Sequence, residues 1–305
     1  MDTANADNPL VSVVIPCYRQ AHFLPDAIES ALRQSYARVE IVVVDDGSPD
    51  DTARVATRYP RVRCVRQPNR GLSAARNAGL RASAGEYVVF LDADDRLTLD
   101  ALELGVREMA LHPDCAFVAG EHDLIDEKGA HLPSMPRRRI SADHYRELLE
   151  TNFIWCPANV MYRRSVFATV GAFDTSCAAS EDYDLYLRIA RRFPVRTHHQ
   201  LVAEYRVHRA SMSRNSGRML RSTMRILRSQ REQLKGDPVL EAACDNGIRN
   251  CQNLYGIRLI SQIAVDMRVR RWPQVVRDSF VALWYCPSAF TAHARDRLRR
   301  TIAGY

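Results

Sequence analysis

The chain has 305 residues, of which 46% are hydrophobic, and a formal net charge of +7. This length can bury a full core, as one large domain or as one domain plus an appendage, and the composition is that of a soluble globular protein. No apolar stretch reaches the roughly 20 residues that cross a bilayer, and no signal-peptide pattern is present. The eight cysteines form no CxxC pair, which argues against a disulfide framework or a zinc site. We therefore expect a cytoplasmic protein with reduced thiols.

Apolar runs alternate with helical periodicity over the first 111 residues. The runs lack polar alternation, as do strands that are covered on both faces. Leu24 to Gln34 repeats apolar residues at the spacing of an amphipathic helix. We predict strands at 11–15, 39–44, 61–65 and 87–91, and helices at 24–34, 73–83 and 99–111. Thr98 would cap the helix at 99–111. A further helix would start after a cap at Ser48, with Pro49 in its first helical position.

This alternation predicts an α/β fold with an open, mostly parallel sheet that has helices on both faces. Ligands of such sheets bind at the carboxyl ends of the strands. We place one domain at 1–214 and an arginine-rich helical C-terminal region at 215–305. Within the first domain, the alternation fails past residues 117–121. We predict strands at 117–121, 159–162 and 201–207, helices at 145–150 and 181–192, and a loop at 131–139.

Residues 86–96 read EYVVFLDADDR, an apolar strand that ends on three carboxylates. In an extended chain, Asp92 and Asp94 would lie on one face roughly 7 Å apart and, at an effective dielectric of about 20, repel by roughly 2 kcal/mol. Water, a proton, an arginine or a divalent cation would offset that repulsion. Mg²⁺ or Mn²⁺ suits the pair, because these hard cations bind carboxylates and phosphate oxygens together. Acids at strand ends also cap helices, the only role we give Asp50, Asp51 and Asp100.

A second acidic pair, Asp45 and Asp46, ends the strand at 39–44. A parallel sheet would bring both acidic clusters to the same rim. Between them, NRGLSAARNAG at 69–79 is a glycine-bearing turn that opens a helix. The N-terminus of that helix and Arg76 are candidates to bind an anion.

Four stretches of the chain together resemble the family 2 glycosyltransferases of the GT-A fold. They lie in the family's order over about residues 1–210, and a DxD motif alone would be a far weaker signal. The resemblance implies a Rossmann-like sheet, an inverting transfer reaction, a nucleotide-sugar donor at the sheet rim, and a glycan or lipid-linked acceptor. The stretches are VSVVIPCYRQ at 11–20, VEIVVVDDGSPDDT at 39–52, NRGLSAARNAGLRASAGEYVVFLDADD at 69–95, and GAFDTSCAASEDYDLYLRIAR at 171–191.

The resemblance also assigns roles to single residues. Asp95 matches a further acid that is often present in the family. The resemblance therefore does not say which of Asp92, Asp94 and Asp95 performs which role. The resemblance implies that Pro16 and Tyr18 line the base pocket, that Asp46 hydrogen-bonds the base, that Arg76 holds the nucleotide, and that Asp92 and Asp94 serve the ribose and the metal.

Glu181-Asp182 matches the family's acidic pair, and Asp182 takes the position of the general base. The alternative is that both acids only stabilise a helix N-terminus, by about 0.3–1 kcal/mol each. That location also keeps Asp182 ionised and able to accept a proton. We place Glu181 with the acceptor-binding residues.

Three further residues have a functional and a structural interpretation. His208 would complete the metal site or contact the diphosphate, and Arg206 would do the latter, but a histidine near a strand end is as often structural. Trp155 would stack on an acceptor sugar or pack in the core.

Two other classes of protein compete with the transferase. A receiver-like phosphotransfer domain would need a lysine at a later strand end, and neither Lys128 nor Lys235 is so placed. A non-catalytic nucleotide-sugar-binding or scaffold protein is the remaining alternative, against which the intact acids argue. We expect no nucleic-acid partner, because the basic region lacks interleaved aromatic residues and a known module.

The C-terminal region carries most of the positive charge. Residues 211–305 hold 17 basic and 7 acidic side chains. Arginines at 218, 221, 225 and 228 recur at helical spacing, and arginines at 268–271 and 295–300 flank the aromatic stretch 280–285. We formulate two hypotheses: a peripheral site for an anionic membrane surface, at the inner membrane face, or a helical subdomain with solvated arginines.

Overall fold

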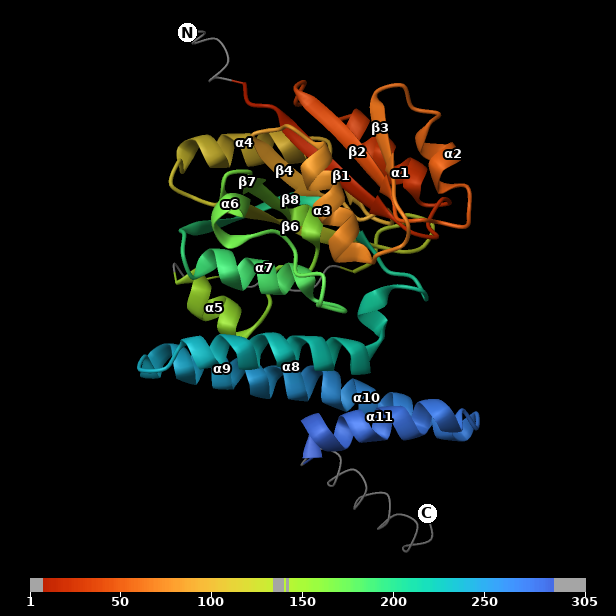
Figure 1. Cartoon of the computed structure of the whole chain (residues 1–305), viewed down its shortest axis with the longest axis vertical. Helices are drawn as coiled ribbons and strands as arrows, with labels where there is room; N and C mark the ends of the chain where they lie inside the picture. Colours follow the sequence, from red (N-terminus) through yellow and green to blue (C-terminus); the bar gives the residue numbers. More distant parts are fainter. Residues whose placement is uncertain (1–7, 134–139, 141–142, 288–305) are drawn as a thin grey trace, which may run out of the picture. The chain divides into compact units, whose positions relative to one another are not determined.

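The computed structural model describes residues 8–133, 140 and 143–287 (Figure 1). The chain forms two compact units. Among the described residues, the sheet unit comprises 8–133, 140, 143–145, 153–176 and 181–208, and the helical unit comprises 146–152, 177–180 and 209–287.

The sheet unit has the predicted α/β architecture, with strands and helices alternating over its first half. Its strands are β1 (Val11–Cys17), β2 (Val39–Asp45), β3 (Val62–Arg66), β4 (Tyr87–Phe90), β5 (Arg96–Leu97), β6 (Phe117–Ile125), β7 (Val160–Arg163) and β8 (Val195–Arg206). Its helices are α1 (Leu24–Leu32), α2 (Thr52–Ala56), α3 (Leu72–Ala82), α4 (Ala101–Leu111), α6 (Val166–Val170) and α7 (Glu181–Ala190), with a 3-10 turn, η2 (Pro157–Asn159), before β7.

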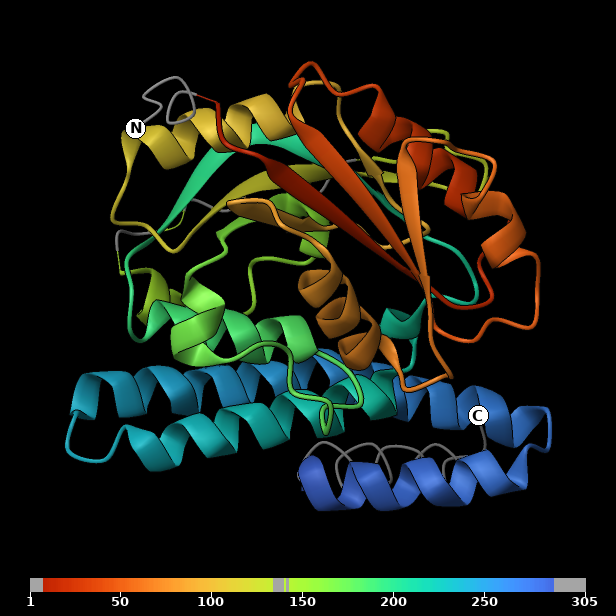
Figure 2. The ribbon, with the colours of Figure 1, turned by 45° about the horizontal axis from the view of Figure 1, so that its top comes forward.

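The eight strands pair in the order β3-β2-β1-β4-β7-β6-β8-β5. Strand β1 is parallel to β2 and β4, and β6 is parallel to β8. Strand β7 is antiparallel to both β4 and β6, so β6 and β8 run in the same direction as β1. The carboxyl ends of β1, β2, β4, β6 and β8 therefore share one rim of an open, mixed sheet (Figure 2). This arrangement confirms the predicted fold class.

Helices cover both faces of the sheet because its central strands are apolar on both sides. All seven residues of β1 are buried. On one face, Val13 and Ile15 belong to a core that includes Leu24 of α1 and Leu102 of α4. On the other face, β2 packs against Ala75 and Ala78 of α3. Unalternated apolar strands thus account for the two-sided covering, as the sequence predicts.

An aromatic cluster fills the space under α6 and α7. Phe90 of β4 makes edge contacts with Tyr162, Phe167 and Phe173, at ring-centroid distances of 5.8, 6.2 and 4.8 Å. Tyr162 lies almost parallel to Tyr186 of α7 at 6.4 Å. These contacts fix α7, and the acids at its start, against the sheet.

Helix α3 approaches the sheet closely at Gly79. A Cβ added there would lie 2.2 Å from the Cγ1 of Val14 and 3.1 Å from the Cγ2 of Val44. We expect Gly79→Ala to lower the free energy of unfolding by about 1–3 kcal/mol, despite the better helix propensity of alanine, because the core would be overpacked. Urea denaturation measures this difference.

Gly217 provides the matched control for that prediction. It also lies in a helix, α8, but its added Cβ would come no closer than 3.3 Å to another atom, the end of the flexible Leu259 side chain, with Asp278 Oδ1 at 3.5 Å and Asn215 Oδ1 at 3.9 Å. Gly217→Ala should therefore leave stability unchanged or slightly raised. Equal effects of the two substitutions would contradict the proposed close packing of α3.

Several predicted boundaries were wrong. Helix α2 begins at Thr52 rather than after a cap at Ser48, and α4 begins at Ala101, after Asp100 rather than Thr98. Strands β6 and β8 are longer than predicted, whereas β5 and α6 were missed. Part of the predicted loop at 131–139 and the arginines at 295–300 lie outside the described residues.

The largest local difference concerns the acids after β4. The strand ends at Phe90, and Asp92 to Asp95 form a turn in which the Asp95 N–H donates to the Asp92 carbonyl at 3.0 Å. Asp92 and Asp94 are therefore not alternate residues of an extended strand, and the expected shared face is not formed in that way.

The helical unit consists mainly of four helices: α8 (Ser216–Gln233), α9 (Pro238–Cys251), α10 (Ile257–Arg268) and α11 (Trp272–Tyr285). The side chain of Asn215 caps α8, and that of Asp237 caps α9. A π-helical turn, η4 (Gln252–Gly256), joins α9 to α10, and the short helix α5 (His144–Glu150) continues from the sheet unit into this unit. No helix in the described part of the chain is long and apolar enough to cross a membrane.

Candidate functional site

The candidate site lies on the rim of the sheet unit, where β4 and β8 end near the start of α7. Strand β8 runs parallel to β6, so its last residues reach the same rim as the turn after β4. The topology therefore brings His208 to Asp94 across 114 positions of sequence, with Nε2 and Oδ2 2.8 Å apart.

Arg76 of α3 is the central cation of this site. Its side chain is 1% exposed, and its two terminal nitrogens donate separately to Asp92 Oδ1 at 2.6 Å and Glu181 Oε1 at 2.5 Å. The guanidinium carbon lies 5.3 Å from the ring centroid of Phe173. Burial alone would lower the pKa of Arg76, but Asp92, Glu181 and Asp182 raise it overall. Arg76 thus stays charged inside the protein and joins the turn after β4 to the start of α7.

Asp182 is a half-buried acid beside this pair. Its Oδ1 accepts a hydrogen bond from the Tyr183 N–H at 2.8 Å. Burial, followed by repulsion from Glu181, raises the pKa of Asp182 to about 7, although Arg76 opposes that shift. A carboxylate with this pKa is well matched to exchange a proton near neutral pH.

The three acids of the turn after β4 have different partners. Asp92 binds Arg76, and Asp94 binds His208. Asp95 is buried and accepts from the Arg206 backbone N–H at 2.8 Å and from Cys156 Sγ at 3.4 Å. Burial raises the pKa of both Asp92 and Asp95, and it raises the pKa of Asp95 well above its ordinary value. Asp95 therefore holds the turn from inside, whereas Asp92 and Asp94 lie toward the rim.

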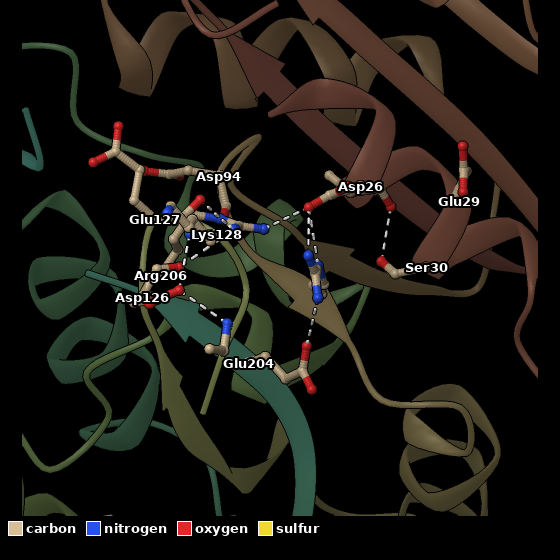
Figure 3. Close-up of polar contacts among 12 residues, drawn as sticks. Asp26, Glu29, Ser30, Asp94, Asp126, Glu127, Lys128, Glu204 and Arg206 are labelled. Atoms are coloured by element: carbon tan, nitrogen blue, oxygen red, sulfur yellow. Dashed lines mark hydrogen bonds and ion pairs between the residues drawn. The ribbon is translucent and has the colours of Figure 1, made fainter. Parts of the chain in front are cut away.

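The guanidinium of Arg206 binds the protein itself. It donates to the Asp94 carbonyl at 2.7 Å and to Asp26 Oδ2 at 2.7 Å, and its remaining nitrogen reaches the carbonyls of Asp126 and Glu127 at 3.3 and 3.0 Å (Figure 3). The side chain is 1% exposed. The hypothesis that Arg206 contacts a diphosphate is therefore wrong, because all its nitrogens bind α1, the turn after β4 and the loop after β6.

The residues predicted to bind the nucleotide differ in their exposure to solvent. Asp46 is buried and accepts from the N–H groups of Arg70 and Gly71, each at 2.9 Å, so it shapes the loop before α3. Pro16 is buried in β1 opposite Val44. Tyr18, just after β1, is exposed. The roles of these residues toward a nucleotide stay predictions.

The predicted acceptor residues are not brought together. Trp155 is half exposed and lies 6.3 Å from the ring of His122. Glu181 is buried and bonded to Arg76, so its carboxylate is directed into the protein. A contact of either residue with an acceptor stays a prediction.

In the described part of the chain, no three or more His, Cys, Asp and Glu side chains are arranged to hold a metal ion. Asp94 and His208 nevertheless fit part of such a site, since a carboxylate oxygen and an imidazole nitrogen are both ligands that Mn²⁺ accepts. Phosphate oxygens and water would have to complete the shell.

Sequence reasoning missed the bonds that hold this site together. Asn77 accepts from the Phe173 N–H at 2.9 Å and donates to its carbonyl at 2.8 Å, which fixes the segment before α7 on α3. The pairs Arg76–Glu181 and Asp26–Arg206 were also not foreseen. Asn77, Phe173 and Glu181 lie within the stretches that resemble a family, which is a signal for their presence but not for their pairing.

Similarity to known proteins identifies the family and the fold of this chain. A family model described as glycosyl transferase family 2 matches residues 12–171. An uncharacterized glycosyltransferase of Rickettsia felis is 32% identical over 212 residues, which cover 66% of this chain and 34% of that protein. The matched region thus spans only about a third of that relative's length.

Two solved structures share the fold. S. aureus TarS 1-349, in complex with UDP-GlcNAc, has a TM-score of 0.66 and 15% identity, over 93% of this chain and 83% of that chain. Mannosyltransferase PcManGT from Pyrobaculum calidifontis, in complex with GDP-Man and Mn²⁺, has a TM-score of 0.58 and 19% identity, over 90% and 86%. The family model runs from β1 through α6 and includes both acidic rim clusters, so this chain belongs to glycosyl transferase family 2.

Proposed function

We propose that this protein is an inverting, metal-dependent glycosyltransferase that moves a sugar from a nucleotide-diphosphate donor to a hydroxyl group of a glycan or lipid-linked acceptor. The observation that carries the proposal is the position of Asp182, a half-buried acid with a pKa near 7 beside the ion pairs of Arg76. Family membership and the donors bound by the two structural neighbours support the choice of donor class.

The donor would bind along the rim of the sheet unit. We assign Pro16 and Tyr18 to the base, Asp46 to the loop that receives it, and Asp92 to the ribose. Arg76 would act through Asp92, because both of its terminal nitrogens are used within the protein. The shared rim of β1, β2 and β4 supports this assignment.

Asp94 and His208, with Asp92, would hold a Mg²⁺ or Mn²⁺ ion. When bound, the ion would neutralise charge on the diphosphate leaving group. The residues of this chain supply the rest of the site: Arg206 fixes the Asp94 backbone through a hydrogen bond to its carbonyl.

Asp182 would accept the proton of the acceptor hydroxyl. As that O–H bond breaks, the oxygen forms a bond to the anomeric carbon of the donor, and the bond from that carbon to the diphosphate oxygen breaks with its electron pair leaving on the diphosphate. Attack opposite the leaving group inverts the configuration of the carbon. Glu181 would position Arg76, which keeps the acids at the site close together.

Thermal-shift measurements with nucleoside diphosphates, with and without Mn²⁺, test donor binding, because a ligand that binds only the folded protein stabilises it. We expect at least one diphosphate to raise the melting temperature in a Mn²⁺-dependent way. Slow Mn²⁺-dependent hydrolysis of the matching nucleotide sugar would separate the enzyme from the alternative, a non-catalytic nucleotide-sugar-binding or scaffold protein.

Asp94→Asn should remove the Mn²⁺-dependent part of diphosphate binding, because asparagine carries no charge for the cation. Isothermal calorimetry with the diphosphate and Mn²⁺ measures this loss. Asp100→Asn changes an exposed acid at the start of α4 and should bind as the wild type does. Unchanged Mn²⁺ dependence in the Asp94 variant would refute the metal assignment.

A further inference from the structure

Helix α11 exposes a continuous apolar surface. Trp272, Val276, Phe280, Leu283 and Trp284 are 54%, 55%, 70%, 50% and 74% exposed, respectively. Successive members are three or four residues apart or adjacent, so they share one face of the helix. We call these five side chains the α11 face.

The opposite side of α11 already forms its core contacts within the helical unit. Val275, Val281 and Ala282 are buried. The Tyr285 carbonyl accepts from Gln252 Nε2 at 2.6 Å, and Arg228 of α8 lies over the Tyr285 ring. The orientation of α11 is therefore fixed by its buried side, which leaves two tryptophans and a phenylalanine directed outward. An exposed apolar surface of this kind indicates an interaction site.

The surroundings of the α11 face are basic. Residues 257–287 contain five arginines and two aspartates. One aspartate, Asp266, is buried and lies 3.8 Å from Arg271, and Asp278 is half-buried. The five arginines, at positions 258, 268, 270, 271 and 277, are all exposed.

We propose that the α11 face docks on an anionic lipid membrane surface. Tryptophan and phenylalanine suit the boundary between lipid headgroups and acyl chains, and arginines beside them attract anionic headgroups. A second copy of this chain fits less well, because a twofold interface would bring the same arginine-rich surroundings against each other. Docking does not depend on the proposed transfer reaction, although it would suit a lipid-linked acceptor.

Bromine-labelled lipids test whether the α11 face itself enters the membrane. The chain has three tryptophans, and the third, Trp155, lies in the sheet unit. We expect vesicles that contain brominated phosphatidylglycerol to quench the tryptophan fluorescence of the full chain. Trp272→Phe/Trp284→Phe should keep binding but lose most of the quenching. Undiminished quenching in that variant would place the contact elsewhere and overturn the proposal.

Vesicle co-sedimentation gives an independent measure. Trp272→Ser/Phe280→Ser/Trp284→Ser should weaken partitioning to phosphatidylglycerol vesicles by about tenfold or more, because apolar burial is lost. The control Leu99→Ser/Leu111→Ser/Val239→Ser changes three residues of similar exposure and should partition as the wild type does. Added salt should release the wild type, and pure phosphatidylcholine should retain less of it.

The remaining outcomes overturn the proposal. Light scattering should show a wild-type monomer at micromolar concentration; a dimer that the triple serine variant abolishes would identify a second copy as the occupant. A folded wild type that binds neither kind of vesicle would refute docking of the α11 face on a membrane. Failure here would leave donor binding and hydrolysis, which involve the sheet unit, unaffected.

Discussion

Asp182→Asn is expected to lower kcat by about 10²–10⁴-fold, the usual range for loss of a general base, and to leave donor binding intact. Asparagine has nearly the same shape as aspartate but cannot accept the proton of the acceptor hydroxyl. Steady-state rates with donor and acceptor measure the loss, and calorimetry with the nucleoside diphosphate measures binding. Equal loss of both would show that Asp182 is structural.

The pH profile provides a second measure of the same role. Burial and Glu181 raise the pKa of Asp182 to about 7, so the wild-type carboxylate is protonated below that pH and ionised above it. Because only the ionised form accepts a proton, kcat/KM should rise with pH through about 7 and level off above it. The profile of the asparagine variant should lack this inflection.

Asp184→Asn is the matched control for the asparagine variant. Asp184 lies two residues further along α7 and is also half-buried, but it pairs with Arg188 at 2.8 Å. Its replacement should leave both kcat and the pH profile unchanged. A similar loss of rate in the two variants would point to the start of α7 as a structural element, without a specific base.

Stability measurements distinguish a loss of catalysis from a loss of folding in these variants. A raised carboxyl pKa means that the folded state binds the proton more tightly than the unfolded state, so Asp182 costs stability as the pH rises from about 4 to about 7. The rise of this pKa from 3.8 to about 7 sets an upper limit of about 4 kcal/mol on that cost, and water around the half-buried group reduces the cost to about 1–2 kcal/mol. Asp182→Asn should therefore melt at a higher temperature than the wild type at pH 8.

Arg76→Met is expected to lower the free energy of unfolding by about 3–5 kcal/mol at neutral pH. Methionine fills part of the space, but Asp92 and Glu181 lose the cation that binds both of them. The buried carboxylate of Glu181 and the half-buried carboxylate of Asp92 would then repel one another near Asp182 without compensation. Urea denaturation at pH 7 measures the loss. The difference from wild type should narrow at acid pH, because protonation removes the uncompensated negative charge.

Arg54→Met is the control for this prediction. Arg54 binds Asp51 with two hydrogen bonds, the shorter of 2.5 Å, but both side chains are largely exposed. Its denaturation midpoint should match that of the wild type, because water replaces the lost partner. If the two arginine variants were equally stable, burial of the Arg76 pairs would have no energetic consequence. Arg76→Lys should fall between wild type and Arg76→Met, since lysine keeps the charge but cannot bind both carboxylates in the same geometry.

The sequence by itself determined the local elements and the chemistry available at their ends. Val11 to Ile15, Val39 to Val44 and Tyr87 to Phe90 are strands because runs of β-branched and aromatic residues fit a sheet that is covered on both faces. The parallel order of such strands also placed both acidic clusters on one rim. These features depend on neighbouring residues, whose spacing can be read directly along the chain.

The tertiary structure decided which of these groups meet. Arg76 and Glu181 are 105 positions apart, and Arg206 and Asp26 are 180 apart. No periodicity encodes such a distance, because a long-range contact depends on how strands are ordered in the sheet and how the intervening chain turns.

The turn at Asp92 and the exposed face of α11 were likewise decided by tertiary contacts. A strand pattern cannot show that β4 ends at Phe90, since the turn is held from outside the strand by Arg206 and Cys156. Periodicity likewise gives α11 an apolar side without showing which side is buried, and packing against its neighbours left Trp272, Phe280 and Trp284 in solvent. Local propensity determined which segments form helices and strands. Burial of one surface against another determined which of their side chains meet at the site and which face solvent.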